Sequence, residues 1–249
     1  MTTESDLYWQ TGAEDAAMQD EHVFVWRAML DTIDTDLTGK RVLDAGCNRG
    51  GFLRLLSSEH RIAAGYGYDP AAAAIDDARR LAGDLPLVFE VGQTVPAGWD
   101  ELDVAFSHEV LYLIHDLAAH AAAIHQVLVP GGVYYATMGV HAAAPTMADW
   151  HERNAERLNL PALYALDDVI ASFEAAGFEA AVARLRMGFV PATRHAESFP
   201  ASLEYYYDHK VMLRFAKARP SRGGAGSNSR PRVRRSTPRI PRAPSCRNS

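Results

Sequence analysis

The sequence of 249 residues is poor in cysteine and lacks long apolar runs, and each shortage excludes a class of protein. Its two cysteines, Cys47 and Cys246, give neither a disulfide framework nor a C-x-x-C redox or metal pair. No apolar run approaches the ~20 residues of a membrane span, and the acidic start lacks the basic and apolar regions of a signal peptide. We therefore expect a cytoplasmic protein that does not enter a membrane.

Metal-ligand motifs are also missing. The histidines are scattered, and neither an H-E-x-x-H motif nor a cluster of paired cysteines is present, so the sequence predicts no metal site.

Positive charge is scarce except at the end of the chain. Residues 1–216 hold 31 acidic and 15 basic residues, a net charge of −16, whereas 217–249 holds ten basic residues and no acidic one. An acidic body disfavours a broad nucleic-acid-binding face. The segment 218–249, rich in Arg, Pro, Ser and Gly, has too few apolar residues to offset its ordering entropy, so we expect it to be disordered. Residues 1–217 then form one domain, with its core from about residue 20.

Alternating strand-like and helix-like segments fill the part of the chain before this tail. With 48% apolar residues the chain can bury one sizeable core, and the alternation predicts an α/β fold. Strands are expected near 42–44, 65–69, 87–91, 103–106, 133–138, 178–187 and 211–215, and helices near 21–37, from 52, and near 71–81, 117–128 and 165–176.

The stretch from Val42 to Leu53 is the most informative one. Val42 and Leu43 suit a buried strand, and Asp44 stands at its carboxyl end. Four residues that tolerate positive φ follow: Gly46, Asn48, Gly50 and Gly51. The turn opens a helix whose amide groups point back at the strand end, which favours a polar or anionic ligand.

The spacing in this turn differs from that of a dinucleotide site. G-x-G-x-x-G lets a pyrophosphate approach the backbone, but here the pattern is D-x-G-x-N-x-G-G, and the carboxylate of Asp44 would repel a pyrophosphate. It would attract a sulfonium cofactor with an α-amino group. The segment resembles motif I, D/E-x-G-x-G-x-G, of the class I S-adenosylmethionine-dependent methyltransferases, with Asn48 in place of the middle glycine.

The resemblance extends from about residue 20 to 217 and implies a fold and a cofactor. The family fold is a doubly wound, mostly parallel seven-stranded sheet with an antiparallel hairpin at one edge, and a helix before the first strand forms a lid. The cofactor would be S-adenosyl-L-methionine. The aromatic pair Tyr8-Trp9, in an otherwise polar start that we expect to be poorly ordered up to Gln19, would suit a cover over this site. The alternative is that the pair occurs by chance and that Trp26 of the helix packs in the core.

Asp69 ends the second predicted strand, nineteen residues after Gly50, where an acidic side chain can accept hydrogen bonds from both ribose hydroxyls. It also precedes Pro70, so capping of the next helix is a compatible alternative. In the resembling family the end of the third strand faces the adenine, and Gln93 stands there, either as a ligand or as an exposed loop residue. Ser107 begins a segment that in the family runs under the methionine half of the cofactor.

Methyl transfer by SN2 attack depends mostly on alignment, and a general base would help only with an acceptor such as a hydroxyl. His108, beside the expected cofactor, and His141, in an irregular segment at 139–159, are the candidates. A histidine in a loop is more often a hydrogen-bonded structural residue, and this alternative stays open for both. We read 139–159 as the substrate-side insertion, because it follows a strand that borders the cleft.

The sequence therefore predicts a methyltransferase that acts on a small molecule, with an O, N or C acceptor atom left open. Two alternatives remain: a nucleic-acid or protein methyltransferase that uses the basic tail, and a non-catalytic S-adenosylmethionine-binding module. The oligomeric state is not predicted.

Overall fold

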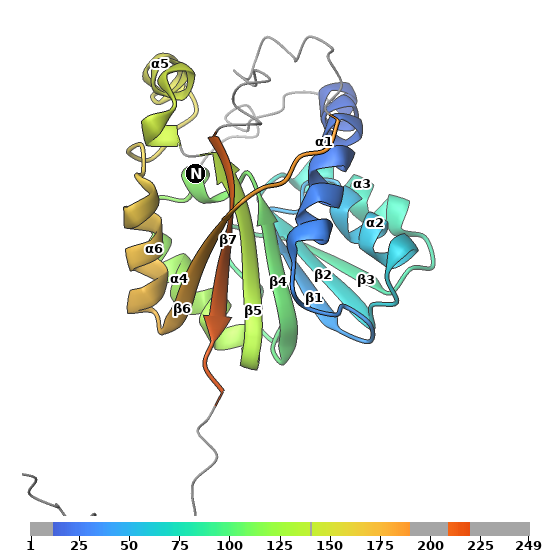
Figure 1. The fold of residues 1–249 in the computed structure, drawn as a ribbon. Helices are drawn as coiled ribbons and strands as arrows, with labels where there is room; N and C mark the ends of the chain where they lie inside the picture. The colour runs from blue at the N-terminus through green and yellow to red at the C-terminus, as the bar shows by residue number, and fades with distance from the viewer. Residues whose placement is uncertain (1–11, 140, 190–208, 220–249) are drawn as a thin grey trace, which may run out of the picture. The chain divides into compact units, whose positions relative to one another are not determined.

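A seven-stranded sheet forms the centre of the computed structural model, which describes residues 12–139, 141–189 and 209–219. The strand order is β3-β2-β1-β4-β5-β7-β6 (Figure 1). The strands are β1 (Arg41–Ala45), β2 (Ala64–Asp69), β3 (Leu87–Val91), β4 (Leu102–His108), β5 (Leu128–Gly139), β6 (Phe178–Arg184) and β7 (Lys210–Lys217). All pairs from β3 to β5 are parallel, and β7 is antiparallel to both β5 and β6. The predicted parallel sheet with an antiparallel edge is confirmed.

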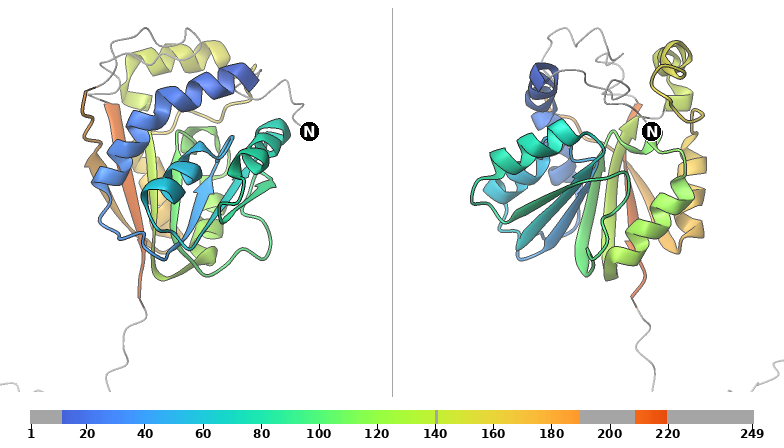
Figure 2. Two further views of the ribbon diagram at one scale, coloured as in Figure 1. Left: turned by 90° about the vertical axis from the view of Figure 1, so that its right-hand side faces the viewer. Right: turned by 180° about the vertical axis from the view of Figure 1, so that it is seen from behind.

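Helices cover both faces of the sheet (Figure 2). On one face lie α1 (Gly12–Thr32), α2 (Gly51–Glu59) and α3 (Ala72–Ala82), and on the other α4 (Leu117–Val127) and α6 (Leu166–Ala175). The short helix α5 (Pro145–Asn154) lies beyond the carboxyl ends of the parallel strands, and the first half of α1 also extends past them (Figure 1). None of the helices in the described ranges is both long and apolar enough to cross a bilayer.

Two apolar cores lie on the two faces of the sheet, because successive strand residues point to opposite sides. Val104 and Phe106 of β4 belong to the core under α1, α2 and α3. Ala105, between them, packs with Tyr134 and with Phe173 of α6 in the core on the opposite face. The side of the sheet that a strand residue faces therefore decides which helices it contacts.

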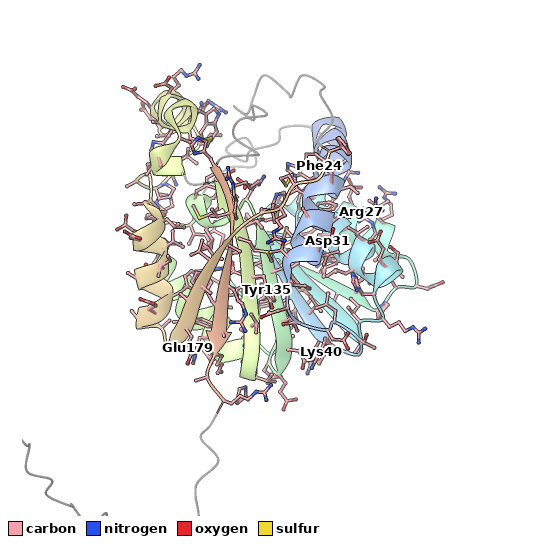
Figure 3. All side chains as sticks on the ribbon, in the orientation of Figure 1. Phe24, Arg27, Asp31, Lys40, Tyr135 and Glu179 are labelled. Carbon is pink, nitrogen blue, oxygen red and sulfur yellow. The ribbon has the colours of Figure 1, made fainter. Side chains whose placement is uncertain are left out.

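The first helix begins earlier and ends earlier than the sequence predicts. It starts at Gly12 rather than near residue 21, so the expectation of poor order is wrong for residues 12–19. This stretch lacks an apolar repeat but contains good helix formers such as Ala, Glu and Gln. The helix stops at Thr32, and the residues after it approach the sheet, where Asp34 and Thr35 hydrogen bond to the hydroxyl of Tyr135. Figure 3 shows Tyr135 on the sheet beside α1.

Other boundaries also differ. The strand expected at 178–187 ends at Arg184, and the segment read as irregular at 139–159 contains a 3-10 turn, η3 (His141–Ala143), followed by α5. Pro145 occupies the first turn of α5, where its missing amide hydrogen is harmless. The described residues lie in one unit that ends at Arg219. The predicted cover Tyr8-Trp9 and the tail from Pro220 onward lie outside the described residues.

Candidate functional site

The turn after β1 has the backbone that its glycines and Asn48 predict. Gly46, Asn48 and Gly50 all have left-handed φ angles, of 75°, 45° and 70°. A Cβ on Gly46 would lie 2.5 Å from Cγ2 of Val110, and one on Gly50 would lie 2.5 Å from Cζ of Phe89. Both glycines are thus required by φ and by close packing, and the turn ends directly at α2.

Asp44 lies at the carboxyl end of β1 with only 3% of its surface exposed. Burial raises its pKa to about 8, and the nearby negative charge of Asp69 adds to this effect. The carboxyl group is therefore mostly protonated at neutral pH in the free protein. A cation bound beside it would reverse this shift by favouring the carboxylate.

Asp69 ends β2 and connects the glycine turn to the start of α3. One carboxylate oxygen accepts a hydrogen bond from the Asn48 amide and the other from the Ala71 amide, each at 2.9 Å. The side chain therefore holds the turn before α3 but does not cap the helix, because Ala71 is the N-cap residue. The ribose contact of Asp69 stays a prediction. Pro70 is exposed next to it.

Gln93 and Ser107, the two remaining predicted cofactor ligands, differ in their exposure to solvent. Gln93 is exposed just beyond the end of β3. Ser107 is fully buried, and its hydroxyl hydrogen bonds to that of Tyr134 at 2.6 Å, on the face covered by α4 and α6. Tyr134 also contacts Nε2 of His120 at 3.2 Å. The side chain of Ser107 is thus held in the core, which leaves its backbone for the predicted cofactor contact.

His108, the last residue of β4, faces the side of α1. Its Nδ1 accepts a hydrogen bond from the indole N–H of Trp26 at 3.1 Å, and the His22 ring packs edge-on at a centroid distance of 4.7 Å. Burial lowers the pKa of His108 well below its ordinary value. Its Nε2 atom is buried and has no hydrogen-bond partner among the described residues. The contact with Trp26 was not visible in the sequence, because 82 residues separate the two.

Beside His108 lies a buried ion pair that sequence reasoning missed. Lys210 is 1% exposed, and its Nζ lies 3.3 Å from Oε1 of Glu109. Glu109 has a positive φ of 57°, a conformation that costs free energy for a residue with a side chain. Because β7 runs antiparallel to β5, its first residue lies opposite Gly139, at the carboxyl end of β5. The sequence feature that could have indicated this ion pair is a lysine at the start of an otherwise apolar strand.

The insertion after β5 contributes apolar side chains to this end of the protein. Ala144, Met147 and Trp150 are buried, and they belong to the same core cluster as Trp26 and Met29 of α1. His141 begins η3 directly after this strand, and its side chain lies outside the described part of the structure. Within the described ranges, no three His, Cys, Asp or Glu side chains are grouped so that they could hold a metal ion.

A hollow of about 430 Å³ lies at the opposite end of the sheet, at the amino ends of β4 and β5. Its charged side chains pair with each other: Lys40 with Asp103 at 3.0 Å and Arg214 with Asp34 at 3.1 Å. Open parallel sheets bind ligands at the carboxyl ends of their strands. The glycine-turn end of the sheet is therefore the candidate site.

Comparison with known proteins gives a family. Residues 18–182 match the model of a family described as "Methyltransferase domain". No curated protein sequence matches the chain.

Solved structures share the fold. A chain from the complex of the Haloferax volcanii Trm112 methyltransferase activator with a candidate methyltransferase is 21% identical, with a TM-score of 0.73 over 88% of this chain and 99% of that one. An S-adenosylmethionine-dependent methyltransferase from Mesorhizobium loti is 18% identical, with a TM-score of 0.62 over 80% and 100%. A geranyl diphosphate C-methyltransferase from Streptomyces coelicolor A3(2), bound to S-adenosyl-L-homocysteine, is 15% identical, with a TM-score of 0.64 over 83% of each chain. At these identities the likeness shows the fold.

Proposed function

Because the chain belongs to the methyltransferase domain family and has the class I fold, with S-adenosylmethionine as cofactor, we propose that it methylates a small organic acceptor. The observation that carries this proposal is the turn from Gly46 to Gly50, which lies between Asp44 and Asp69 at the ends of adjacent strands. We place the activity in residues 1–217.

The two carboxyl groups fit a cofactor that carries positive charge. Asp44 is buried close to Asp69, and in the free protein their mutual repulsion contributes to the raised pKa of Asp44. The α-amino group of the cofactor would relieve this repulsion near Asp44, while the carboxylate of Asp69, which has only acceptor oxygens, would receive the ribose hydroxyls. The close packing of Val110 on Gly46 leaves no room for a Cβ and so keeps a glycine in the turn.

Apolar side chains gather on the acceptor side, which favours a small organic molecule over a charged polymer. Trp26 of α1 and Met147 and Trp150 of α5 are buried in one cluster at this end of the sheet. The acidic body, with a net charge of −16 over residues 1–216, disfavours a nucleic acid as substrate.

When bound, the cofactor supplies an electrophilic sulfonium methyl group. The contribution of the protein is then to exclude water and to hold the acceptor in line with that methyl group. Alignment of this kind can supply about 7–11 kcal/mol of the barrier. A general base is therefore not required for an acceptor atom that is nucleophilic without first losing a proton.

Calorimetric titration with S-adenosylmethionine, S-adenosylhomocysteine and NAD⁺ tests the cofactor assignment. We expect both sulfur cofactors to bind and NAD⁺ not to bind, and release of S-adenosylhomocysteine to accompany incubation with a panel of small acceptors. Tight cofactor binding without turnover on any acceptor would favour a non-catalytic binding module instead. Turnover on nucleic acid, with a steep salt dependence, would contradict the small-molecule proposal.

A further inference from the structure

The hydrogen bond from Trp26 defines the tautomer of His108. An indole N–H can only donate, so Nδ1 of His108, at 3.1 Å, must present a lone pair. In a neutral imidazole the single proton is then on Nε2. The ring therefore has a hydrogen-bond donor, and not a base, at its second nitrogen.

The surroundings of His108 keep the ring neutral. Burial is the main cause of its lowered pKa, and the charges that His22 on α1 and Lys210 on β7 can carry act in the same direction. Glu109, the next residue in the chain, opposes them. Because Glu109 is paired with Lys210, the two charges largely compensate each other, and the effect of burial prevails.

The Nε2–H group itself lacks a hydrogen-bond partner among the described residues, although the atom is buried. An unpaired buried donor is unfavourable, so a ligand atom that accepts this hydrogen bond would stabilise the site. His108 ends β4, which lies between β1, where Asp44 stands, and β5, after which the apolar insertion begins. The donor is therefore located between the cofactor end and the acceptor end of the candidate site.

We propose that Trp26 holds His108 as a neutral hydrogen-bond donor, and that its Nε2–H group binds a carbonyl or carboxylate oxygen of the methyl acceptor. This inference rests on the proposed function and names the acceptor class: molecules with such an oxygen near the methylated atom. It replaces the general-base role that the sequence suggests, because a base needs a lone pair where this tautomer carries the proton.

Nitrogen-15 NMR of the complex with S-adenosylhomocysteine tests the tautomer without any acceptor. We expect a protonated Nε2 and an unprotonated Nδ1 in His108 between about pH 5.5 and 8, a range in which an ordinary histidine titrates. Trp26→Phe keeps an aromatic ring beside Phe52, 5.9 Å away in the wild type, and should remove the tautomer preference. An imidazolium at neutral pH, or a proton on Nδ1, would overturn the proposal.

Two replacements of His108 separate a donor from a base. His108→Gln retains an N–H donor, whereas His108→Leu does not. With an active acceptor, we expect kcat/KM to fall by about 10- to 100-fold in His108→Leu and to stay within about threefold in His108→Gln, with unchanged affinity for S-adenosylhomocysteine in both. Equal losses in both variants, together with an acid limb in the wild-type pH profile, would show that His108 is a base.

Pairs of acceptors that differ only in the carboxylate group test whether His108 binds an acceptor oxygen. We would assay hydroxy acids against their methyl analogues, such as 2-hydroxybenzoate against o-cresol, and expect turnover to favour the members with the carboxylate oxygen. Preference for the analogues that lack it would refute this inference and leave the methyltransferase assignment intact. Failure of S-adenosylmethionine to bind would instead refute the proposed function.

Discussion

Asp44 and Asp69 lie at the ends of neighbouring parallel strands, and their proximity makes the buried carboxyl group of Asp44 hard to ionise. Burial is the larger cause and the charge of Asp69 the smaller one; together they raise the pKa of Asp44 to about 8. Ionisation of Asp44 is thus unfavourable in the free protein, and it would become favourable beside the positive charge that we expect from the cofactor.

The pH dependence of stability should report this arrangement. Since the pKa of Asp44 is higher in the folded state than in the unfolded chain, its contribution to stability is complete below about pH 4 and is lost as the pH rises through about 8. Asn has no ionisable carboxyl group, so the Asp44→Asn variant does not lose stability in this way as the pH rises. The free energy of unfolding of the variant, relative to wild type, should therefore rise with pH by up to about 1.4 kcal/mol per unit over that interval. Urea unfolding at several pH values measures it, and a constant difference would contradict the assignment.

Replacement of Asp69 should weaken cofactor binding. Asp69→Ala removes the predicted ribose contact and also the acceptor for the amides of Asn48 and Ala71, so we expect affinity for S-adenosylmethionine to fall by more than about tenfold. Asp76→Ala is the matched control, because it removes the same charge from an exposed position in α3. Unchanged calorimetric affinity in a folded Asp69→Ala protein would rule out this placement of the ribose.

Gly46→Ala should damage the turn through its backbone and through Val110 together. The new Cβ would have a φ of +75° and would lie 2.5 Å from the valine side chain. Gly39→Ala is a control for the φ alone, since Gly39 has a φ of +71° and no atom within 4 Å of its added Cβ. We expect Gly39→Ala to cost about 1 kcal/mol and to leave cofactor affinity unchanged. Gly46→Ala should cost more and weaken cofactor binding; equal effects of the two would contradict the packing argument.

The pair formed by Glu109 and Lys210 should be strongly coupled. Lys210→Met leaves a carboxylate buried without its cation, which typically costs about 3–5 kcal/mol of stability. Glu109→Gln leaves the ammonium group of Lys210 buried without its anion and should also destabilise the protein. In the double variant Glu109→Gln/Lys210→Met both charges are absent, so much of the loss should be recovered. A double-mutant cycle of chemical unfolding measures the coupling, and additive losses would show that the two side chains are independent.

Removal of residues 220–249 should leave the fold and the cofactor site unchanged. The last strand ends at Lys217, whose amino group hydrogen bonds to the carbonyls of His125 and Leu128. We expect the melting temperature and the affinity for S-adenosylmethionine of the shortened chain to equal those of the full chain. A large loss of either would show that the tail is bound to the acidic body.

The sequence revealed the parts of the site that depend on short stretches of chain. The glycine turn, the strand before it and Asp69 are all readable there, because the backbone needs of a tight turn restrict residue type locally. The contact between Trp26 and His108, and the burial of Lys210, were not predictable, because they depend on how α1 and an antiparallel strand pack against β4 and β5. The position of Ser107 was accessible in principle. Alternation from Phe106 places it on the opposite face from His108.

This alternation means that β4 connects two layers that can be altered separately. Ser107 contacts the layer of α4 and α6 through Tyr134, while its neighbour His108 contacts α1 through Trp26. Directed evolution of acceptor choice can therefore concentrate on the α1 side. Substitutions that improve packing around Tyr134 and Phe173 would raise the free energy of unfolding. They could offset destabilising substitutions beside His108, because the two sets of residues are not in direct contact.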